Sequence, residues 1–335
     1  MHGRLLAYIL AAVLAPAVAL AAPITSLVVV GDSLSDDGNG FILTGGTFPP
    51  PPYDQRASNG PVAVEYLAAA LGVPLAPSAA GGTNFAVLGA ATGAVEIPLL
   101  APLTTENVVA LQYSQAALEG TSLLTQTLGV LSLGPLDPNA LFFVWGGAND
   151  LAIDPSLTTA GNAINNLASI ISALYFSGAR QFLVPNLPDL SLTPFGLSLS
   201  PADSAGLQAL TIGFNVGLAD ALTGLSGLPD IDIEQFDTFS QFNAILANPA
   251  AFGFSTTSTP CVTGNLQDGG SVCDDPDSYV FWDSVHPTTA AHQVLGSAFA
   301  AAVEGPVPEA VPEPTSLTLL GLGVGLAAAA RRRRS

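Results

Sequence analysis

Three short polar segments of this sequence carry side chains that could do chemistry together. The first is Gly31-Asp32-Ser33-Leu34-Ser35-Asp36, which directly follows the apolar run 27–30. A serine just after a buried strand is held at the edge of a sheet, where the free N–H groups of a following helix can lie near its oxygen. Asp-Ser is also an ordinary turn or N-cap signal, so this segment alone does not distinguish a nucleophile from a turn.

The second segment supplies a base, which a serine nucleophile needs with a pKa near neutrality. Beyond residue 22 the chain has two histidines, His286 and His292. Asp283 precedes His286 by three positions, close enough for its carboxylate to face the imidazole and fix its tautomer. Pro287 disfavours helix at His286 and leaves the ring on a loop. His292 lies within the helical pattern 290–302, and we interpret it as a packing or surface residue.

The third segment is Gly146-Gly147-Ala148-Asn149-Asp150, which follows the apolar run 141–145. Its two glycines allow the backbone to approach a ligand, and the Asn149 amide can donate a hydrogen bond to a developing oxyanion. Asn149 or Asp150 could instead cap the helix that follows. The serine segment and the Asp-x-x-His spacing together favour the catalytic interpretation.

The elements that must position these segments alternate along the chain. Short β-rich runs occur at 26–31, 141–145, 181–185 and 230–234, the last with the period-two alternation of an edge strand. Helical patterns occur between and after them, at 61–71, 160–177, 204–225 and 288–304. This alternation predicts a parallel sheet covered by helices on both faces. Ligand sites in such sheets lie beyond the carboxyl ends of the strands, where the three polar segments would meet.

The charge balance excludes one large class of partner. The 335 residues carry 26 acidic and 7 basic side chains, for a formal net charge of −19. The interior keeps only Arg56 and Arg180, because the other arginines are Arg4 and Arg331–Arg334. Binding to a phosphate backbone needs a positive stripe, so we expect no nucleic-acid partner. Hydrophobic residues make up 49% of the chain, which is enough for a sizeable core.

The first 22 residues have the layout of a secretory signal peptide. Arg4 is followed by the apolar stretch 5–20 and by small residues near position 21. This is the order of charged region, apolar region and cleavage site in such peptides. A retained N-terminal membrane anchor is the alternative interpretation.

Two cysteines, Cys261 and Cys273, lie twelve positions apart in a polar segment. In an oxidising compartment they could form a disulfide, which would be consistent with export. Two free buried thiols are the alternative.

The C-terminal end combines three features. Val311-Pro312-Glu313-Pro314 is followed by the apolar run 317–330 and by Arg331–Arg334. This pattern resembles the PEP-CTERM sorting signal of exported bacterial proteins. The resemblance implies processing by an exosortase-type enzyme and contact with the membrane only through this tail before processing. A simple tail anchor is the alternative, and both place the folded part outside the cytoplasm.

Together the polar segments resemble the SGNH, or GDSL, hydrolase superfamily over residues 26–303. The serine block is Gly31–Asp36, the Gly-x-Asn-Asp block is 147–150, and the Asp-x-x-His block is 283–286. The glycine block is approximated by 84–90, where Leu88-Gly89 stands in place of the usual Gly-Gly. The similarity is greatest to the bacterial lipolytic branch of secreted phospholipases and haemolysin-like esterases.

The resemblance implies a three-layer α/β/α sandwich of flavodoxin-like type, with a parallel central sheet of about five strands. It also implies a serine esterase with Ser33, His286 and Asp283 as nucleophile, base and orienting acid. The oxyanion hole would consist of the Ser33 and Gly89 N–H groups and the Asn149 side chain. Asp32, Gly147 and Asp150 support these groups. The chemistry needs no metal and no cofactor.

Three regions are expected: a signal peptide at 1–22, a hydrolase domain at 23–304, and a tail at 305–335 with an apolar helix at 316–330. The substrate would be a lipid or short-chain acyl ester, and we expect residues 97–103 and 191–199 to line the acyl site. The alternatives are an exopolysaccharide O-acetyl esterase and a non-catalytic envelope or matrix protein on the same scaffold. The localisation would be the cell envelope or the extracellular space.

Overall fold

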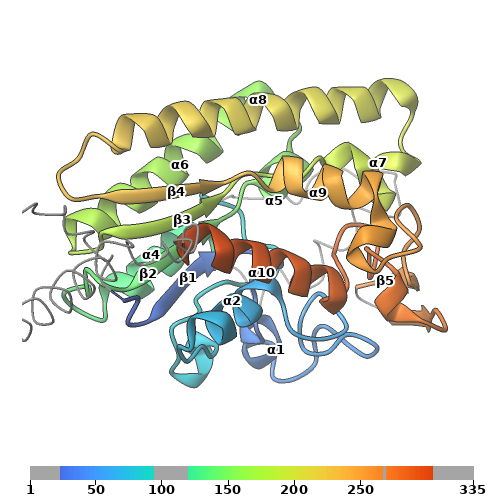
Figure 1. Cartoon of the computed structure of the whole chain (residues 1–335), viewed down its shortest axis with the longest axis horizontal. Coiled ribbons are helices and arrows are strands. Elements are labelled where there is room, and N and C mark those ends of the chain that lie inside the picture. Colours follow the sequence, from blue (N-terminus) through green and yellow to red (C-terminus); the bar gives the residue numbers. More distant parts are fainter. Residues whose placement is uncertain (1–22, 94–119, 267–268, 305–335) are drawn as a thin grey trace, which may run out of the picture.

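A parallel sheet of four strands forms the centre of the molecule (Figure 1). The structure is a computed structural model that describes residues 23–93, 120–266 and 269–304. The strand order is β1-β2-β3-β4, and all three pairings are parallel. The strands are β1 (Leu27–Gly31), β2 (Leu141–Trp145), β3 (Gln181–Pro185) and β4 (Asp232–Phe236).

Helices and a small hairpin make up the rest of the regular secondary structure in the described chain. The α-helices are α1 (Asn39–Leu43), α2 (Ala63–Leu71), α4 (Leu123–Leu131), α5 (Ala148–Ile153), α6 (Leu157–Phe176), α7 (Pro194–Ser198), α8 (Pro201–Leu225), α9 (Thr238–Ala247) and α10 (Thr289–Glu304). The 3-10 helices are η1 (Ser78–Ala80), η3 (Leu190–Leu192), η4 (Pro249–Phe252) and η5 (Pro276–Ser278). The antiparallel hairpin consists of β5 (Val262–Asn265) and β6 (Gly269–Val272).

Helices cover both faces of the sheet, as the alternating sequence pattern predicted. Val28, Phe142 and Val184 pack against the layer formed by α4, α6 and α8. Leu27, Phe143 and Leu183 pack against the opposite layer, formed by α2 and α10. Figure 1 shows the two layers on opposite sides of the strands. Every residue of β1 and β2 is buried because both faces are covered, which explains their continuous apolar sequences.

The expected number of about five strands is not confirmed, since the sheet of the described residues has four. The segment 83–87 runs along the free edge of β1, where the Val29 N–H donates to Thr83 and the Phe85 N–H donates to Val29. Only one bridge forms there, between Val29 and Asn84. The Asn39 side chain donates to the carbonyls of Asn84 and Ala86 on the outer side of this segment. The backbone of 76–78 also pairs there, because the Asn84 N–H donates to the Ala76 carbonyl and the Ser78 N–H donates to the Asn84 carbonyl. Each pairing is a single bridge, so the segment does not form a regular ladder.

The predicted edge strand is confirmed, with its start shifted. β4 lies at the edge of the sheet but begins at Asp232 rather than Asp230. Asp230 has a positive φ of 58°, which belongs to a turn. Helix α6 begins before the predicted position because the Ser156 side chain accepts a hydrogen bond from the Thr159 N–H and caps it.

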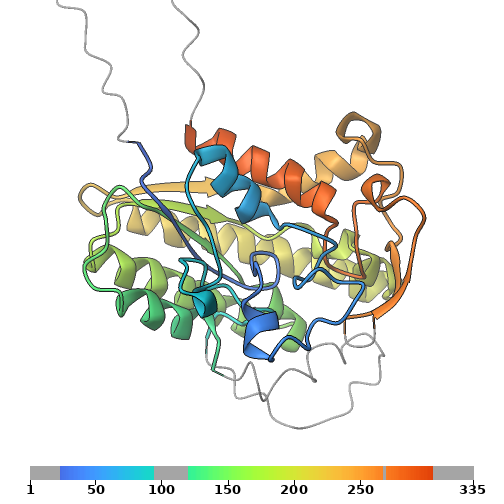
Figure 2. The same cartoon turned by 90° about the horizontal axis from the view of Figure 1, so that it is seen from below.

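The two ends of the described chain lie on the same side of the molecule (Figure 2). Residue 23 precedes the amino end of β1, and residue 304 ends α10, which runs back toward that same edge of the sheet. The carboxyl ends of the strands face the opposite side. The expected signal peptide at 1–22 and tail at 305–335 lie outside the described residues. Within the described part of the chain, no helix is both long and apolar enough to span a bilayer.

Candidate active site

The Asp283–His286 loop is folded by its own aspartate. Asp283 Oδ1 accepts hydrogen bonds from the N–H groups of Val285 at 2.9 Å and His286 at 2.8 Å. The Trp282 N–H donates to the His286 carbonyl at 2.8 Å and closes the turn. Pro287 follows directly, and α10 begins at Thr289. The imidazole therefore stands on a tight loop before the helix, as the sequence predicted.

Ser33, His286 and Asp283 form one connected chain of hydrogen bonds. The distance from Ser33 Oγ to His286 Nε2 is 3.0 Å. On the other side of the ring, His286 Nδ1 lies 2.8 Å from Asp283 Oδ2 and 3.0 Å from Oδ1. Ser33 and Asp283 are 8% and 4% exposed. A proton can thus be passed from the serine hydroxyl to a ring whose opposite nitrogen faces a carboxylate.

The imidazole and the carboxylate stabilise each other's charge. Burial alone would lower the pKa of His286, but the facing Asp283 outweighs burial and raises it above the ordinary 6.5. Burial would likewise raise the pKa of Asp283, but the attraction of His286 and the hydrogen bonds to it outweigh burial, so the pKa lies below the ordinary 3.8. Asp283 is therefore a carboxylate at neutral pH, and His286 has an enhanced affinity for a proton.

The serine segment is a turn held at the carboxyl end of β1. Asp32 is buried, its Oδ1 accepts the Leu34 N–H at 3.0 Å, and its carbonyl accepts the N–H groups of Ser35 and Asp36. Burial raises the pKa of Asp32 to about 6, against the opposing effects of the Leu34 N–H and of His286. The turn leaves the Ser33 hydroxyl free to face His286.

A buried glutamine that the motif analysis did not single out fixes the end of β1. Gln126, on α4, accepts the Gly31 N–H at 2.9 Å and donates to the Gly31 carbonyl at 2.8 Å. Its oxygen takes the place of a neighbouring strand's carbonyl at the Gly31 N–H, while the Gly31 carbonyl also accepts the Val87 N–H at 3.2 Å. A buried glutamine in an apolar helix was the available sequence signal, because buried amides need partners.

The Gly147–Asp150 segment lies beside the serine turn, at the carboxyl end of β2. Gly147 has φ +113°, and a Cβ there would lie 2.5 Å from the Phe214 ring, so the position requires glycine. Asp150 accepts the Thr92 N–H at 2.9 Å and the Thr92 hydroxyl at 2.7 Å. Burial raises the Asp150 pKa, and the Thr92 bonds oppose that rise. The Asn149 amide donates to the Ala90 carbonyl at 3.0 Å.

Gly89 lies in the turn that these two side chains tie down. Its φ is +72° and it is exposed. None of the described residues accepts a hydrogen bond from its N–H, whereas the N–H of the preceding Leu88 donates to Asp36 at 2.8 Å. The turn around Gly89 thus presents an N–H that has no partner among the described residues, next to the Asn149 segment. Leu88, which replaces the glycine usual in the resembling family, is buried with its side chain over Gly40.

His292 takes no part in this arrangement. It is 1% exposed on α10, and its Nδ1 accepts the Ala63 N–H of α2 at 3.2 Å. Burial, together with the nearby His286, lowers the pKa of His292 to about 3. It is a neutral packing residue between two helices, one of the two positions that the sequence allowed.

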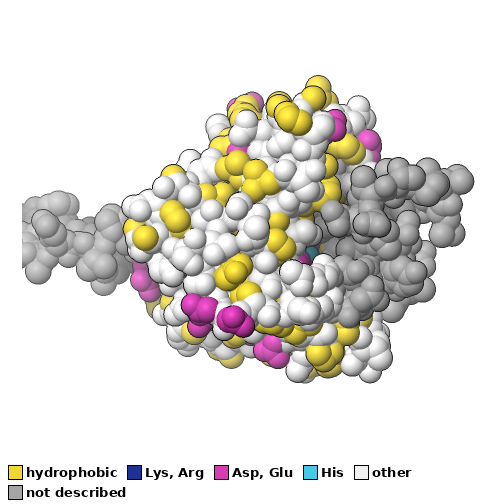
Figure 3. Space-filling model, turned by 90° about the vertical axis from the view of Figure 1, so that its right-hand side faces the viewer, with side chains coloured by type: hydrophobic (Ala, Val, Ile, Leu, Met, Phe, Trp, Pro, Cys, Tyr) yellow, Lys and Arg dark blue, Asp and Glu magenta, His cyan; other side chains and the backbone are white. Residues whose placement is uncertain are grey.

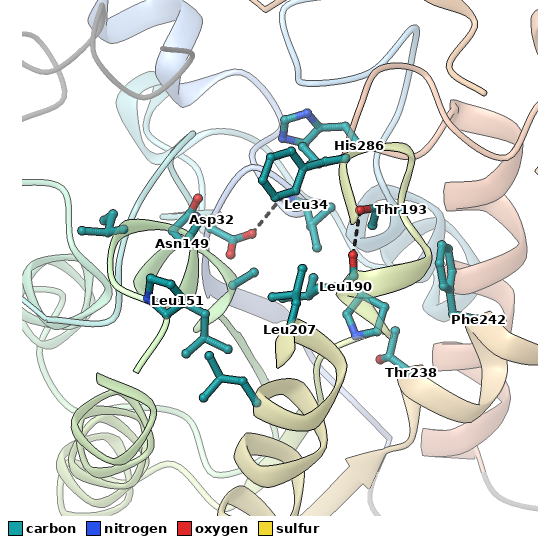
Figure 4. A pocket seen from close by; sticks show the side chains of 18 of the residues that line it. Asp32, Leu34, Asn149, Leu151, Leu190, Thr193, Leu207, Thr238, Phe242 and His286 are labelled. Carbon is teal, nitrogen blue, oxygen red and sulfur yellow. Dashed lines mark hydrogen bonds between the residues drawn. The ribbon is translucent and has the colours of Figure 1, made fainter. Parts of the chain in front are cut away.

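Next to Ser33 lies an apolar cavity of about 750 Å³ (Figure 4). Asp32, Asn149 and His286 mark its reactive end, while Leu151, Leu190 and Leu207 project into it from α5, η3 and α8. Within the expected lining segment 191–199, Thr193, Phe195 and Leu199 contribute, whereas residues 97–103 lie outside the described residues. In Figure 3 a histidine side chain is visible at the surface, with apolar side chains on one side of it.

Comparison with known proteins identifies the family. Residues 27–299 match the GDSL-like lipase/acylhydrolase model, and residues 310–334 match the PEP-CTERM protein-sorting motif. A GDSL esterase/lipase from Arabidopsis thaliana is 27% identical, covering 81% of this chain and 86% of the relative. A phosphatidylcholine-sterol acyltransferase from Aeromonas hydrophila is 27% identical, covering 83% of this chain and 90% of the relative. An extracellular lipase from Streptomyces rimosus aligns with 83% of this chain and 98% of its own, at a TM-score of 0.34 and 15% identity.

The match covers most of the chain and includes all three polar segments. The sorting motif indicates export and sorting to the cell envelope. The chain belongs to the GDSL-like lipase/acylhydrolase family and is a carboxylic ester hydrolase with a PEP-CTERM sorting motif.

Proposed function

We propose that the protein hydrolyses lipid esters outside the cytoplasm through an acyl-enzyme on Ser33. The observation that carries this proposal is the connected chain Ser33–His286–Asp283 at the mouth of an apolar cavity. An unactivated serine is a weak nucleophile, and the facing imidazole is the group that activates it.

In the proposed mechanism, Ser33 Oγ attacks the ester carbonyl while its proton moves to His286 Nε2. Asp283 orients the ring and stabilises the imidazolium that forms. His286 then gives this proton to the leaving alcohol, which departs from the tetrahedral intermediate and leaves the acyl group on Ser33. A water molecule repeats the sequence, with His286 again as base, and releases the carboxylic acid.

The oxyanion would be stabilised by the N–H groups of Ser33 and Gly89 and by the Asn149 amide. One hydrogen of this amide is used by the Ala90 carbonyl, so the amide group is oriented and its second hydrogen remains available. Asp150 and Gly147 hold this segment in place, and Asp32 shapes the turn that carries Ser33. Preorganised donors of this kind stabilise the developing charge without reorganising during the reaction.

The cavity supports an acyl chain of several carbons rather than an acetyl group. Its walls are mainly apolar side chains from several helical elements, and burial of each methylene contributes about 0.8 kcal/mol to binding. The Aeromonas hydrophila relative is named as a phosphatidylcholine-sterol acyltransferase, which also supports a lipid acyl group. An acetylated polysaccharide would leave most of this cavity empty.

The remaining features of the proposal concern fold and location. Counting the segment 83–87 at the edge of β1, the strand order would be the 2-1-3-4-5 order of flavodoxin-like folds. We further propose a signal peptide at 1–22, a hydrolase domain at 23–304, and an exosortase-processed tail at 305–335 that anchors the protein transiently. The described domain begins and ends near the amino ends of the strands, whereas the cavity lies at their carboxyl ends beside Ser33, so an anchored tail would leave the site accessible.

Ser33→Ala tests the proposal directly. Since it removes the nucleophile and little volume, we expect loss of p-nitrophenyl butyrate hydrolysis by at least about 10³-fold, with the melting temperature nearly unchanged. The measurements are the hydrolysis rate, labelling by a fluorophosphonate and thermal unfolding. A variant as active as the wild type would disprove the nucleophile assignment.

Gly206→Leu tests the acyl site. Gly206 lines the cavity on α8 and has open space at its Cβ position, so a leucine there would occupy room meant for the acyl chain. We expect the ratio of palmitate to acetate p-nitrophenyl ester hydrolysis to fall about tenfold, as in an overpacked site. Gly213→Leu is the matched control, because Gly213 is on the same helix, also has open space and is not part of the cavity lining. An unchanged ratio in both variants would place the acyl chain elsewhere.

A further inference from the structure

A buried tyrosine contacts the active-site carboxylate from a distant part of the sequence. The Tyr53 hydroxyl donates a hydrogen bond to Asp283 Oδ2 at 2.9 Å, and 230 positions separate the two residues. Tyr53 is 5% exposed, and its ring packs edge-on against Trp282 with a centroid distance of 6.0 Å. The oxygen that accepts this bond is the one that lies 2.8 Å from His286 Nδ1.

The loop that carries Tyr53 holds both sides of the Asp283–His286 turn. Five residues beyond Tyr53, the Ser58 hydroxyl donates to the Pro287 carbonyl at 2.9 Å. The next side chain, Asn59, accepts the Thr289 N–H at 2.8 Å. The Tyr53 hydroxyl thus contacts the first residue of this turn, whereas Ser58 and Asn59 contact the residues that follow it. Only the Tyr53 contact reaches the carboxylate itself.

The hairpin of β5 and β6 covers Tyr53 on its outer side. Val262 and Cys261 pack in the same apolar cluster as Tyr53 and Trp282. The Val262 N–H donates to the Trp282 carbonyl at 2.8 Å, and a disulfide joins Cys261 to Cys273 at the base of the hairpin. The phenol is therefore enclosed, and its hydroxyl is directed at Asp283 rather than at solvent.

We propose that Tyr53 is a positioning residue, which fixes the Asp283 carboxylate and moderates its charge toward His286. This inference rests on the proposed roles of Ser33, His286 and Asp283. Because Oδ2 shares its negative charge between two donors, the carboxylate attracts the imidazolium proton less than it would with His286 alone. Burial and the neighbouring Asp283 raise the pKa of Tyr53 far above its ordinary value, so the hydroxyl stays protonated and can only donate to a carboxylate.

The titratable groups around His286 come from three elements. Asp283 faces Nδ1 from the loop itself, Asp32 acts from the end of β1, and His292 lies behind it on α10. Asp32 also attracts a proton on His286, whereas His292 stays neutral because its pKa is about 3. A change at Tyr53 alters only the Asp283 contribution.

Tyr53→Phe removes the hydroxyl and keeps the ring on Trp282. The rate constant for fluorophosphonate labelling of Ser33, measured against pH, is the readout, since it requires neutral His286 and does not depend on the natural substrate. We expect the rate at the high-pH plateau to fall about tenfold, the loss typical of one hydrogen bond to a charged group. The labelling rate falls at low pH, where His286 becomes protonated, and we call this part of the profile the acid limb. We expect it to move up by about half a pH unit, because Asp283 then attracts the proton on His286 more strongly.

Tyr175→Phe is the matched control. Tyr175 is also buried, at 8% exposure, and its hydroxyl donates to the Pro229 carbonyl at 3.0 Å, far from the active site. Both variants lose one buried hydrogen bond, so a similar drop in melting temperature is expected. If Tyr53→Phe has the same plateau rate and the same acid limb as Tyr175→Phe, Tyr53 is structural only and the inference is wrong.

Replacing all six tyrosines by 3-fluorotyrosine provides a test that does not remove the hydroxyl. Fluorination makes the phenol a stronger donor, so the acid limb should move down, in the direction opposite to Tyr53→Phe, and should not move in the Tyr53→Phe background. An unmoved limb would contradict the inference.

His286→Ala keeps the two proposals separate. Undiminished fluorophosphonate labelling of this variant would overturn the proposed mechanism. An unchanged labelling rate and acid limb in Tyr53→Phe would overturn only the role of Tyr53.

Discussion

Asp283 and Asp32 are both buried carboxyl groups near the His286 ring, but their surroundings move their pKa values in opposite directions. Burial raises the pKa in both cases. At Asp283 the facing imidazole and its hydrogen bonds overcome burial and bring the pKa below 3.8. At Asp32 one N–H donor and a weaker attraction to His286 leave the pKa at about 6. The loop before α10 thus keeps Asp283 ionised well into the acidic range, whereas Asp32, in the turn after β1, becomes protonated below about pH 6.

The number of donors does not explain this difference. Asp36, in the same turn as Asp32, accepts four backbone N–H groups, from Gly38, Asn39, Gly40 and Leu88. Burial nevertheless raises its pKa to about 6. What distinguishes Asp283 is a titratable base in direct contact, whose positive form it stabilises. The charge pair is therefore localised at the position where the proposed mechanism needs it.

Asp283→Asn should give the largest effect that separates the two carboxyl groups. The amide cannot stabilise an imidazolium, and it can hold the ring in the wrong tautomer, so we expect the hydrolysis rate to fall about 10⁴-fold. The pKa of His286 should also fall, because burial then acts on the ring without the opposing carboxylate. The acid limb of the residual activity therefore moves to lower pH. Rates against pH with p-nitrophenyl butyrate measure both effects.

Asp232→Asn is the control for this change, since Asp232 is exposed at the start of β4, at the amino end of the sheet. Its activity should equal that of the wild type. Retention of more than a tenth of the wild-type rate by folded Asp283→Asn would remove the functional distinction between Asp283 and Asp32.

The local part of this site could be predicted from sequence because its geometry is local. The Asp283 contacts with His286 span three positions, and Pro287 and the start of α10 constrain the same turn. The buried strands β1 and β2 could also be predicted, since burial on both faces demands continuous apolar runs. The order of these elements then brings Ser33 and Asn149 to one edge of the sheet.

The long-range part could not be predicted in this way. Tyr53 ends a run of four prolines, which indicates an extended loop but not what the loop contacts. Its partner depends on how this loop packs against a hairpin more than 200 positions later. The segment 83–87 was missed as a neighbour of β1 for a related reason. It forms single bridges to Val29 and Pro77 and further hydrogen bonds to the side chain of Asn39, and such irregular pairing leaves no alternating pattern in the sequence.

Asp32→Asn should give the smallest effect, in stability rather than in chemistry. The folded pKa of Asp32 is about 6, above the ordinary 3.8, so its contribution to stability is full below pH 3.8 and is lost as the pH rises through 6. Asparagine keeps the acceptor for the Leu34 N–H without the buried charge. We expect the variant to be more stable than the wild type by about 1 kcal/mol at pH 8, or ~2–4 °C in melting temperature, and by much less at pH 5. Activity should stay within about tenfold of the wild type, because Asp283 alone faces Nδ1. If the stability difference between the variant and the wild type is less favourable to the variant at pH 8 than at pH 5, Asp32 is held as a stabilised anion like Asp283.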